Sequence, residues 1–138
     1  MATQYGTQMA KLNAGTTPAP GFVDGALRVF CEEVALASQP TTDVIEVARL
    51  PRGAIPMFGV IETDTSLGTA TLAIGIAGAA AKYRAAATLT ATDAPALFGV
   101  GAAIGGALAD EETVIATIGT AALPASGTLR VMFFYAFD

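Results

Sequence analysis

The chain has 138 residues, a length that fits one domain with a single core. Hydrophobic residues make up 53% of the sequence, but its 15 glycines and 7 prolines would break helices too often for a helical bundle. The formal charge is −5 without a basic run, which argues against nucleic acid as a direct partner. Histidine and tryptophan are absent and Cys31 is the only cysteine, which excludes an internal disulfide, a His-dependent nucleophile and an ordinary structural zinc site.

Residues 1–22 mix Gln, Thr, Ala, Gly and Pro with neither helical nor strand periodicity. Such a segment cannot bury enough apolar surface to fold by itself, and Pro18 and Pro20 favour extended backbone. We therefore predict an extended N-terminal arm at residues 1–22, able to reach as far as about 70 Å, followed by a folded domain at residues 23–138. A terminal segment without a role is the alternative. The segment also lacks the basic head and apolar centre of a secretory signal.

Short β-like runs alternate with turn clusters through the rest of the chain. In the run 25–33, Leu27 and Val29 fall on one face of a strand and Arg28 and Phe30 on the other. Further strands are predicted at 43–50, 54–62, 69–77, 96–102, 113–120 and 128–137. A spacing of about ten residues indicates a sandwich or barrel, and we expect an all-β, antiparallel β-sandwich of jelly-roll-like type that carries the arm.

The segment 79–88, AAAKYRAAAT, is the one plausible helix of the domain. A helix of this length is marginal in water. The segment therefore fits a short helix, a loop packed against the sheet, or a strand in a solvent-facing register.

The first and last predicted strands open alike, with GALRV at 25–29 and GTLRV at 127–131. The outer strands of a jelly roll commonly lie side by side in one sheet, so similar sequences would meet similar environments there. Under this interpretation Arg28 and Arg130 project from one face, and each needs a carboxylate or open water. Convergence of strand composition is the alternative, and a true duplication is disfavoured because the similarity fades after a few residues.

Carboxylates are the remaining candidates for catalysis. Glu32 and Glu33 are neighbours in a strand and point to opposite faces, so they do not share a site. Glu62 and Asp64, and the acidic turn 110–112, are interpreted as solvated charges beside turns. No loop has the alternating acidic spacing of a calcium site. We therefore predict no catalytic residue, no metal site and no cofactor.

The stretch 94–109, APALFGVGAAIGGALA, is uncharged but shorter than the roughly 20 residues that cross a bilayer, and it contains Pro95 and four glycines. Its glycines superficially match a dinucleotide fingerprint, yet the flanking strand and helix are missing and the last gap is too long. We expect a glycine-rich strand and loop with no membrane span. Cys31 is predicted to be a small buried apolar residue.

Several stretches stand out together: M-A-T-x-Y-G-T-Q at the start, G-A-L-R-V-F-C-E-E-V-A-L-A at 25–37, D-V-I-E-V-A-R-L-P-R-G-A at 43–54, D-T-S-L-G-T-A-T-L-A-I-G-I at 64–76 and G-T-L-R-V-M-F-F-Y-A at 127–136. As a set they resemble small virion structural proteins of tailed bacteriophages, of the kind found beside the major capsid protein. The resemblance spans nearly the whole chain, but its motifs are strand and turn patterns and carry no catalytic residue.

The resemblance implies a head decoration, or cement, protein that binds the outside of the shell, with the major capsid protein as partner and a homo-oligomer, often a trimer, as its form. It places the protein in the virion after synthesis in the host cytoplasm, and it implies no enzymatic activity. A minor tail, collar or head-fibre component is the alternative. A carbohydrate-binding sandwich would need more exposed aromatic residues than three tyrosines and no tryptophan provide.

Such a role requires a compact body and a strand that can add to the edge of a neighbour's sheet. A trimer that engages several subunits would gain durable attachment from modest contacts. The apolar last strand, with Phe134 among its aromatic residues, would bury surface between protomers. The predicted interaction residues are Tyr5, Lys11, Pro18, Pro20 and Phe22 in the arm, and Phe133, Tyr135 and Phe137 in the last strand.

Overall fold

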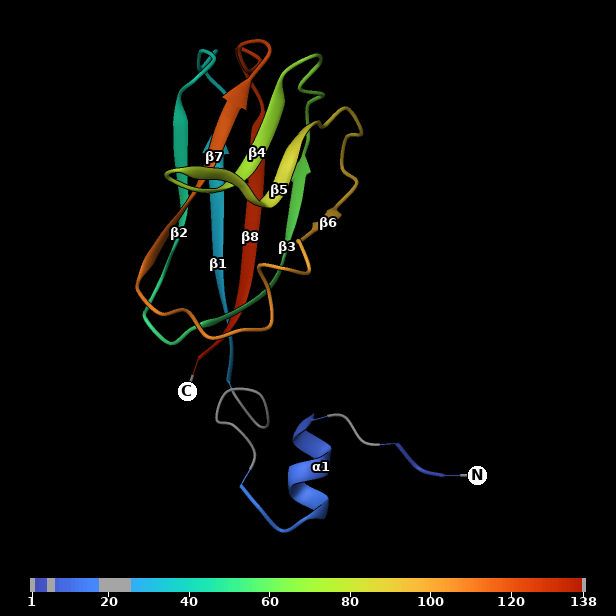
Figure 1. Ribbon diagram of the computed structural model, residues 1–138. Coiled ribbons are helices and arrows are strands. Elements are labelled where there is room, and N and C mark those ends of the chain that lie inside the picture. Colours follow the sequence, from blue (N-terminus) through green and yellow to red (C-terminus); the bar gives the residue numbers. More distant parts are fainter. Residues whose placement is uncertain (1, 5–6, 18–25, 138) are drawn as a thin grey trace.

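The structure is a computed structural model that describes residues 2–4, 7–17 and 26–137. These residues form one short helix and eight strands, labelled in Figure 1. The elements are α1 (Thr7–Asn13), β1 (Ala26–Ala35), β2 (Val44–Leu50), β3 (Ile55–Thr63), β4 (Thr71–Ile76), β5 (Ala79–Thr88), β6 (Ala96–Phe98), β7 (Glu112–Gly119) and β8 (Thr128–Phe137). Strands therefore dominate the fold, as the spacing of apolar runs and turns predicts.

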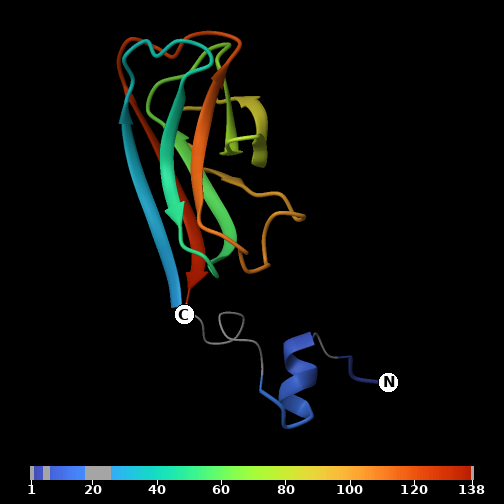
Figure 2. The same cartoon turned by 60° about the vertical axis from the view of Figure 1, so that its left-hand side comes forward.

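The strands form two antiparallel four-stranded sheets that pack face to face (Figures 1 and 2). Sheet I has the order β1-β8-β3-β6 and sheet II the order β2-β7-β4-β5. The chain passes from one sheet to the other at nearly every connection, which is the connectivity of a jelly roll. The predicted all-β, jelly-roll-like sandwich is confirmed.

The first and last strands are neighbours, as predicted, because β1 and β8 pair antiparallel over ten residue pairs. The prediction that the two arginines share a face is wrong. Arg28 lies opposite Tyr135, which faces the core, whereas Arg130 lies opposite Glu33 on the outside of the sheet. The register pairs each even-numbered residue of β1 with an odd-numbered residue of β8, and directly paired residues share a face. Two even-numbered arginines therefore point to opposite sides.

The core lies between the sheets and uses inward side chains of both. Tyr83 of β5 and Phe133 of β8 are fully buried, and their rings meet edge to face with centroids 4.9 Å apart. Burial of one large apolar side chain contributes about 1.5–3 kcal/mol. Other fully buried members of the cluster are Val47, Leu50, Ile61, Leu72, Ile74, Val114, Ile118, Leu129 and Val131.

The ambiguous stretch 79–88 is a strand, the third of the predicted alternatives, and pairs with β4 at the edge of sheet II. Tyr83 is its one buried residue, so most of its alanines face solvent. The guanidinium of Arg84 donates hydrogen bonds to the main-chain carbonyls of Leu72 and Ala87, and burial lowers the pKa of that guanidinium. Pairing and carbonyl contacts thus override the helical propensity of alanine.

The strand predicted at 96–102 is shorter than expected, because β6 ends at Phe98 and turns follow it. The ring of Phe98 covers Gly59 of β3, where an added Cβ would overlap the ring. Gly59 therefore leaves the space in which β6 anchors its one buried side chain.

The helix α1 lies within residues 1–22, where the sequence shows no helical periodicity. The hydroxyl and main-chain N–H of Thr16 both donate to the carbonyl of Lys11 and close the C-terminal end of the helix. Seven residues are too few to show a period in the windows used to recognise helices. The extended backbone predicted at Pro18 and Pro20 falls outside the described residues.

Candidate interaction surface

The outer face of sheet I, which points away from sheet II, carries apolar side chains on all four strands. In its central row, Val29 of β1 lies beside Phe134 of β8, which lies beside Phe58 of β3. We call this surface the apolar face and define it by Leu27, Val29, Cys31, Phe58, Val60, Leu97, Met132 and Phe134. Since the inner positions of β3 and β8 are also apolar, these strands are hydrophobic on both sides.

Much of the apolar face is open to solvent. Relative exposures reach 61% for Leu27, 51% for Val29, 38% for Phe58 and 76% for Leu97. Phe58 stacks on Phe134 with ring centroids 4.8 Å apart, so a pair of aromatic rings occupies the centre of the face. Exposed apolar side chains that gather on one face of a domain are typical of a surface that binds another molecule.

A row of charged residues borders the apolar face at one end. Arg130 of β8 donates to Glu33 of β1 at 2.6 Å and to Glu62 of β3 at 2.7 Å. The hydrogen bond and charge of Glu33 raise the pKa of the Arg130 guanidinium. Two carboxylates and one guanidinium leave this row with a net charge of −1. An apolar centre with a polar rim is the usual anatomy of a protein interface.

Other acidic residues near the turns have structural roles. The carboxylate of Asp64 accepts a hydrogen bond from the main-chain N–H of Thr128 at 2.8 Å, and this bond is the main cause that lowers its pKa. Glu112 accepts a hydrogen bond from the hydroxyl of Tyr83 at 2.7 Å and pairs with Lys82. Burial, followed by the bond to Glu112, raises the pKa of the Tyr83 phenol. These carboxylates connect elements of the fold and are more constrained than the solvated charges that the sequence predicts.

The predicted interaction residues of the last strand point mainly inward. Phe133 is 1% exposed and Tyr135 is 8% exposed, so both belong to the core of their own chain. Phe137 is half-buried and packs against the same core. The prediction that Phe133 and Tyr135 bind a partner is therefore corrected, because odd-numbered positions of β8 face sheet II while Phe134 lies on the outer side.

Of the predicted interaction residues in the arm, the structure describes Lys11, which is half-exposed on α1. Tyr5, Pro18, Pro20 and Phe22 lie outside the described residues. In Figures 1 and 2, α1 stands apart from the sandwich, so Lys11 does not join the residues of β8 in one site.

The remaining sequence candidates do not form a site. Cys31, predicted to be buried, is exposed, because it sits on the outer side of edge strand β1 beside Met132. Within the described ranges, no group of three or more His, Cys, Asp or Glu residues could hold a metal ion. The same part of the chain has no helix that is both long and apolar enough to cross a bilayer.

Sequence reasoning missed most of the apolar face, Phe58 and Leu97 above all. A signal was present in β3, where Phe58, Val60 and Ile61 place apolar residues on both sides of the strand. A strand in a two-layer sandwich needs one apolar side, alternating with a polar one. A second apolar side therefore indicates an additional contact beyond the core.

Comparisons with known proteins give structural neighbours. No protein-family model and no curated protein sequence matches the chain. A chain of the cyanophage Pam1 capsid asymmetric unit is 25% identical, with a TM-score of 0.68 over 100% of this chain and 92% of that chain. A chain of the Ralstonia phage GP4 capsid is 20% identical, with a TM-score of 0.63 over 84% and 86% of the two chains. A chain of the acid-stable capsid of Helicobacter pylori bacteriophage KHP30 is 13% identical, with a TM-score of 0.54 over 83% and 90%. The protein therefore shares its fold with chains of phage capsid structures.

Proposed function

We propose that this chain is a structural protein of a bacteriophage virion, and specifically a head decoration (cement) protein that binds the outer surface of the shell. The observation that carries this proposal is the likeness, over the whole chain and at 25% identity, to a chain of a cyanophage capsid. The role is structural rather than catalytic, which agrees with acidic side chains that are used in ion pairs and turns.

The apolar face supports the proposal physically. A decoration protein has to bury surface against other virion proteins, and rigid strands hold side chains in place before binding, so little entropy is lost. Val29, Phe58 and Leu97 are exposed on three different strands of one sheet. We assign this face to contacts within the virion, either with the major capsid protein or with a second copy of the chain.

Oligomerisation and the arm complete the proposed mode of attachment. We propose a homo-oligomer, in the form of a trimer, whose copies bind several subunits of the shell at once. Multivalent attachment of this kind raises the apparent affinity by increasing the effective concentration of each further contact. Residues 1–22 act as the arm that extends these contacts to neighbouring molecules.

Binding to shells that lack the native protein tests the proposal. Substituting Val29→Glu together with Leu97→Glu places two charges in the apolar face, and an unpaired charge in an interface carries a large desolvation cost. We expect occupancy on such shells, quantified by cryo-electron microscopy or sedimentation, to fall by about tenfold or more. Ala86→Glu, at an exposed position of β5 in sheet II, is the matched control and should bind as the unaltered protein does.

Both substituted positions are exposed, so thermal unfolding of the variants should match that of the unaltered protein. Failure of the unaltered protein to bind any shell would overturn the decoration role. Equal occupancy by the doubly substituted variant and the control would remove the apolar face from the proposal.

A further inference from the structure

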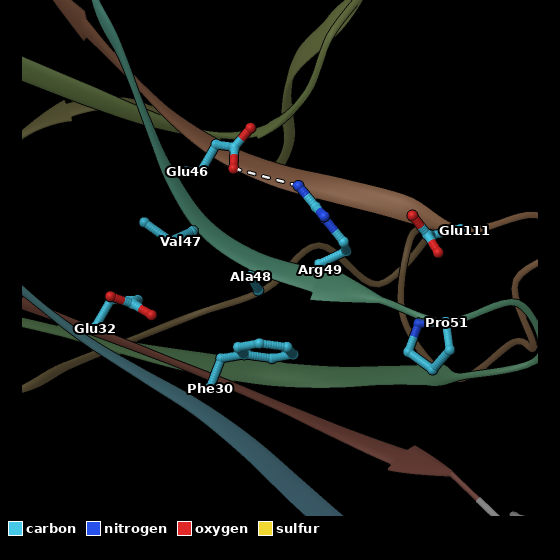
Figure 3. A pocket seen from close by; sticks show the side chains of 8 residues that line it. All are labelled: Phe30, Glu32, Glu46, Val47, Ala48, Arg49, Pro51 and Glu111. Atoms are coloured by element: carbon cyan, nitrogen blue, oxygen red, sulfur yellow. Dashed lines mark ion pairs between the residues drawn. The ribbon is translucent and has the colours of Figure 1, made fainter.

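A cleft opens between the two sheets at the side where their edge strands β1 and β2 run past one another (Figure 3). Its volume is about 470 Å³, within the range of pockets that take up a ligand. The strands belong to different sheets and are not hydrogen-bonded to each other, so the space between the sheets is open along this side. The cleft is distinct from the apolar face, which lies on the other side of β1.

The inner part of the cleft is apolar. The ring of Phe30, from β1, faces β2 across the cleft and stacks on Tyr135 with centroids 5.9 Å apart. Val47 and Pro51 complete this floor from the side of β2 and the turn after it. A partner therefore gains most by inserting apolar side chains.

The rim of the cleft is acidic. Glu46 and Arg49 form an ion pair at 3.6 Å, while Glu32 and Glu111 have no ion-pair partner among the described residues. Three carboxylates and one guanidinium give the rim a net charge of −2. A matching partner thus combines apolar side chains with a positive charge.

The helix α1 has this combination. Met9 and Leu12 are 54% and 46% exposed and, three residues apart, lie on the same side of the helix. Lys11 directly precedes Leu12, projects about 100° from it around the helix, and is the only charged side chain of residues 1–23. A helix of seven residues is unstable by itself in water, so α1 needs a surface to fold against. In Figures 1 and 2 it has none on its own sandwich.

We infer that α1 of one copy docks into the cleft between β1 and β2 of a second copy. Met9 and Leu12 would pack on the apolar floor, and the ammonium of Lys11 would pair with Glu32 or Glu111 on the rim. The 12 residues between Asn13 and Ala26 can extend to about 40 Å, which exceeds the span of a domain of this size. This contact deepens the proposed function, because it gives the arm a defined receptor on the neighbouring copy.

Disulfide trapping between two different variants tests the contact. In a Cys31→Ser background, which removes the only native cysteine, one full-length protein carries Leu12→Cys and another carries Arg49→Cys. We expect the mixture to form a disulfide-linked dimer under mild oxidation, with the two new cysteines joined in the peptide map. Ala86→Cys in place of Arg49→Cys is the matched control, an exposed position away from the cleft. The control should form about tenfold less dimer, because docking does not bring its new thiol close to that of Leu12→Cys.

Equal dimer yields with Arg49→Cys and Ala86→Cys would overturn the inference. A chain that carries both Leu12→Cys and Arg49→Cys distinguishes docking between two copies from docking of the helix on its own chain. If dilute protein closes an internal disulfide while the mixed variants form no dimer, the helix docks on its own chain and the inference between copies is wrong.

Charge reversal gives an independent readout of the same contact. Lys11→Glu should weaken self-association, measured by analytical ultracentrifugation, by roughly two- to fivefold, the range of an exposed ion pair. Combining Lys11→Glu with Glu32→Lys and Glu111→Lys should restore it, and Lys11→Gln should give an intermediate value. If Lys11→Glu leaves self-association unchanged, or if the charge-swapped variant does not restore it, the pairing of Lys11 with the rim is wrong. These experiments use the protein alone, so their failure leaves shell binding, and with it the proposed function, as a separate question.

Discussion

The strands β1 and β8 carry the same tripeptide, Leu-Arg-Val, directly after their first residue, yet the side chains of the two copies lie in opposite environments. Leu129 and Val131 of β8 are fully buried, whereas Leu27 and Val29 of β1 are 61% and 51% exposed. The strands are direct neighbours with side chains of the same kind. Composition therefore does not determine which of them lies inside.

Two features of the sheet explain the difference. The antiparallel register gives the tripeptides opposite orientations, so that Leu129 faces sheet II while Leu27 faces outward. In addition, β8 lies between β1 and β3, whereas β1 is an edge strand. Apolar residues of β8 build the core, and those of β1 are left for a contact outside the chain.

Paired truncations of the two leucines test this comparison and should give the largest effect. Leu129→Ala removes a fully buried side chain from the core and should lower the free energy of unfolding by about 2–5 kcal/mol. Leu27→Ala makes the same chemical change on the exposed side and should cost less than about 0.5 kcal/mol in isolated protein. Urea denaturation of both variants gives the two values. Similar losses would show that the outer face is already covered within the protein in solution.

The two arginines sharpen the comparison through electrostatics, with a smaller effect. Arg130→Gln removes the cation between Glu33 and Glu62 and leaves two carboxylates without their shared partner, so the variant should be less stable. Arg28→Gln, at the matching position of β1, should not change stability. The loss at Arg130 should shrink in high salt, because exposed charges are screened. Thermal unfolding at low and high ionic strength gives the measurement, and equal effects at both positions would contradict the assignment of Arg130 to an ion-pair row.

The fold could be predicted because its signals are local. Alternation of apolar residues and regular turn clusters predicts the strands, and the jelly-roll arrangement predicts that the first and last strands are neighbours, as they are. The face on which a residue lies depends on register, a long-range property set by pairing. This is why strand periodicity alone wrongly predicts that Arg28 and Arg130 share a face and that Cys31 is buried.

The interaction surface could be predicted less well, because exposure is a property of the assembled sheets. The sequence predicts aromatic residues on both sides of β8, but which of Phe133 and Phe134 faces outward follows only from the pairing with β1 and β3. Leu97 gives no signal by itself, and it joins the apolar face only because β6 pairs with Val60 of β3. The cleft between β1 and β2 depends on strands of different sheets and has no signature in the sequence.

The smallest expected effect on stability concerns the first residue of β8, whose main-chain N–H is hydrogen-bonded to a carboxylate. Asp64 accepts a hydrogen bond from the N–H of Thr128, the first residue of β8, and its pKa lies below its ordinary value near 3.8. A lowered pKa means that the unfolded chain binds the proton more readily than the folded chain does. The ionised Asp64 therefore stabilises the fold above the pKa of the unfolded chain, and this stabilisation is lost as the pH falls through the pKa of the folded chain.

Asp64→Asn keeps an acceptor oxygen but lacks the charge. It should be slightly less stable at pH 7, and the difference from the unaltered protein should shrink as the pH falls from about 5. Urea midpoints across that range measure the trend, and a constant difference down to the most acidic point would mean that the charge of Asp64 does not help to anchor β8.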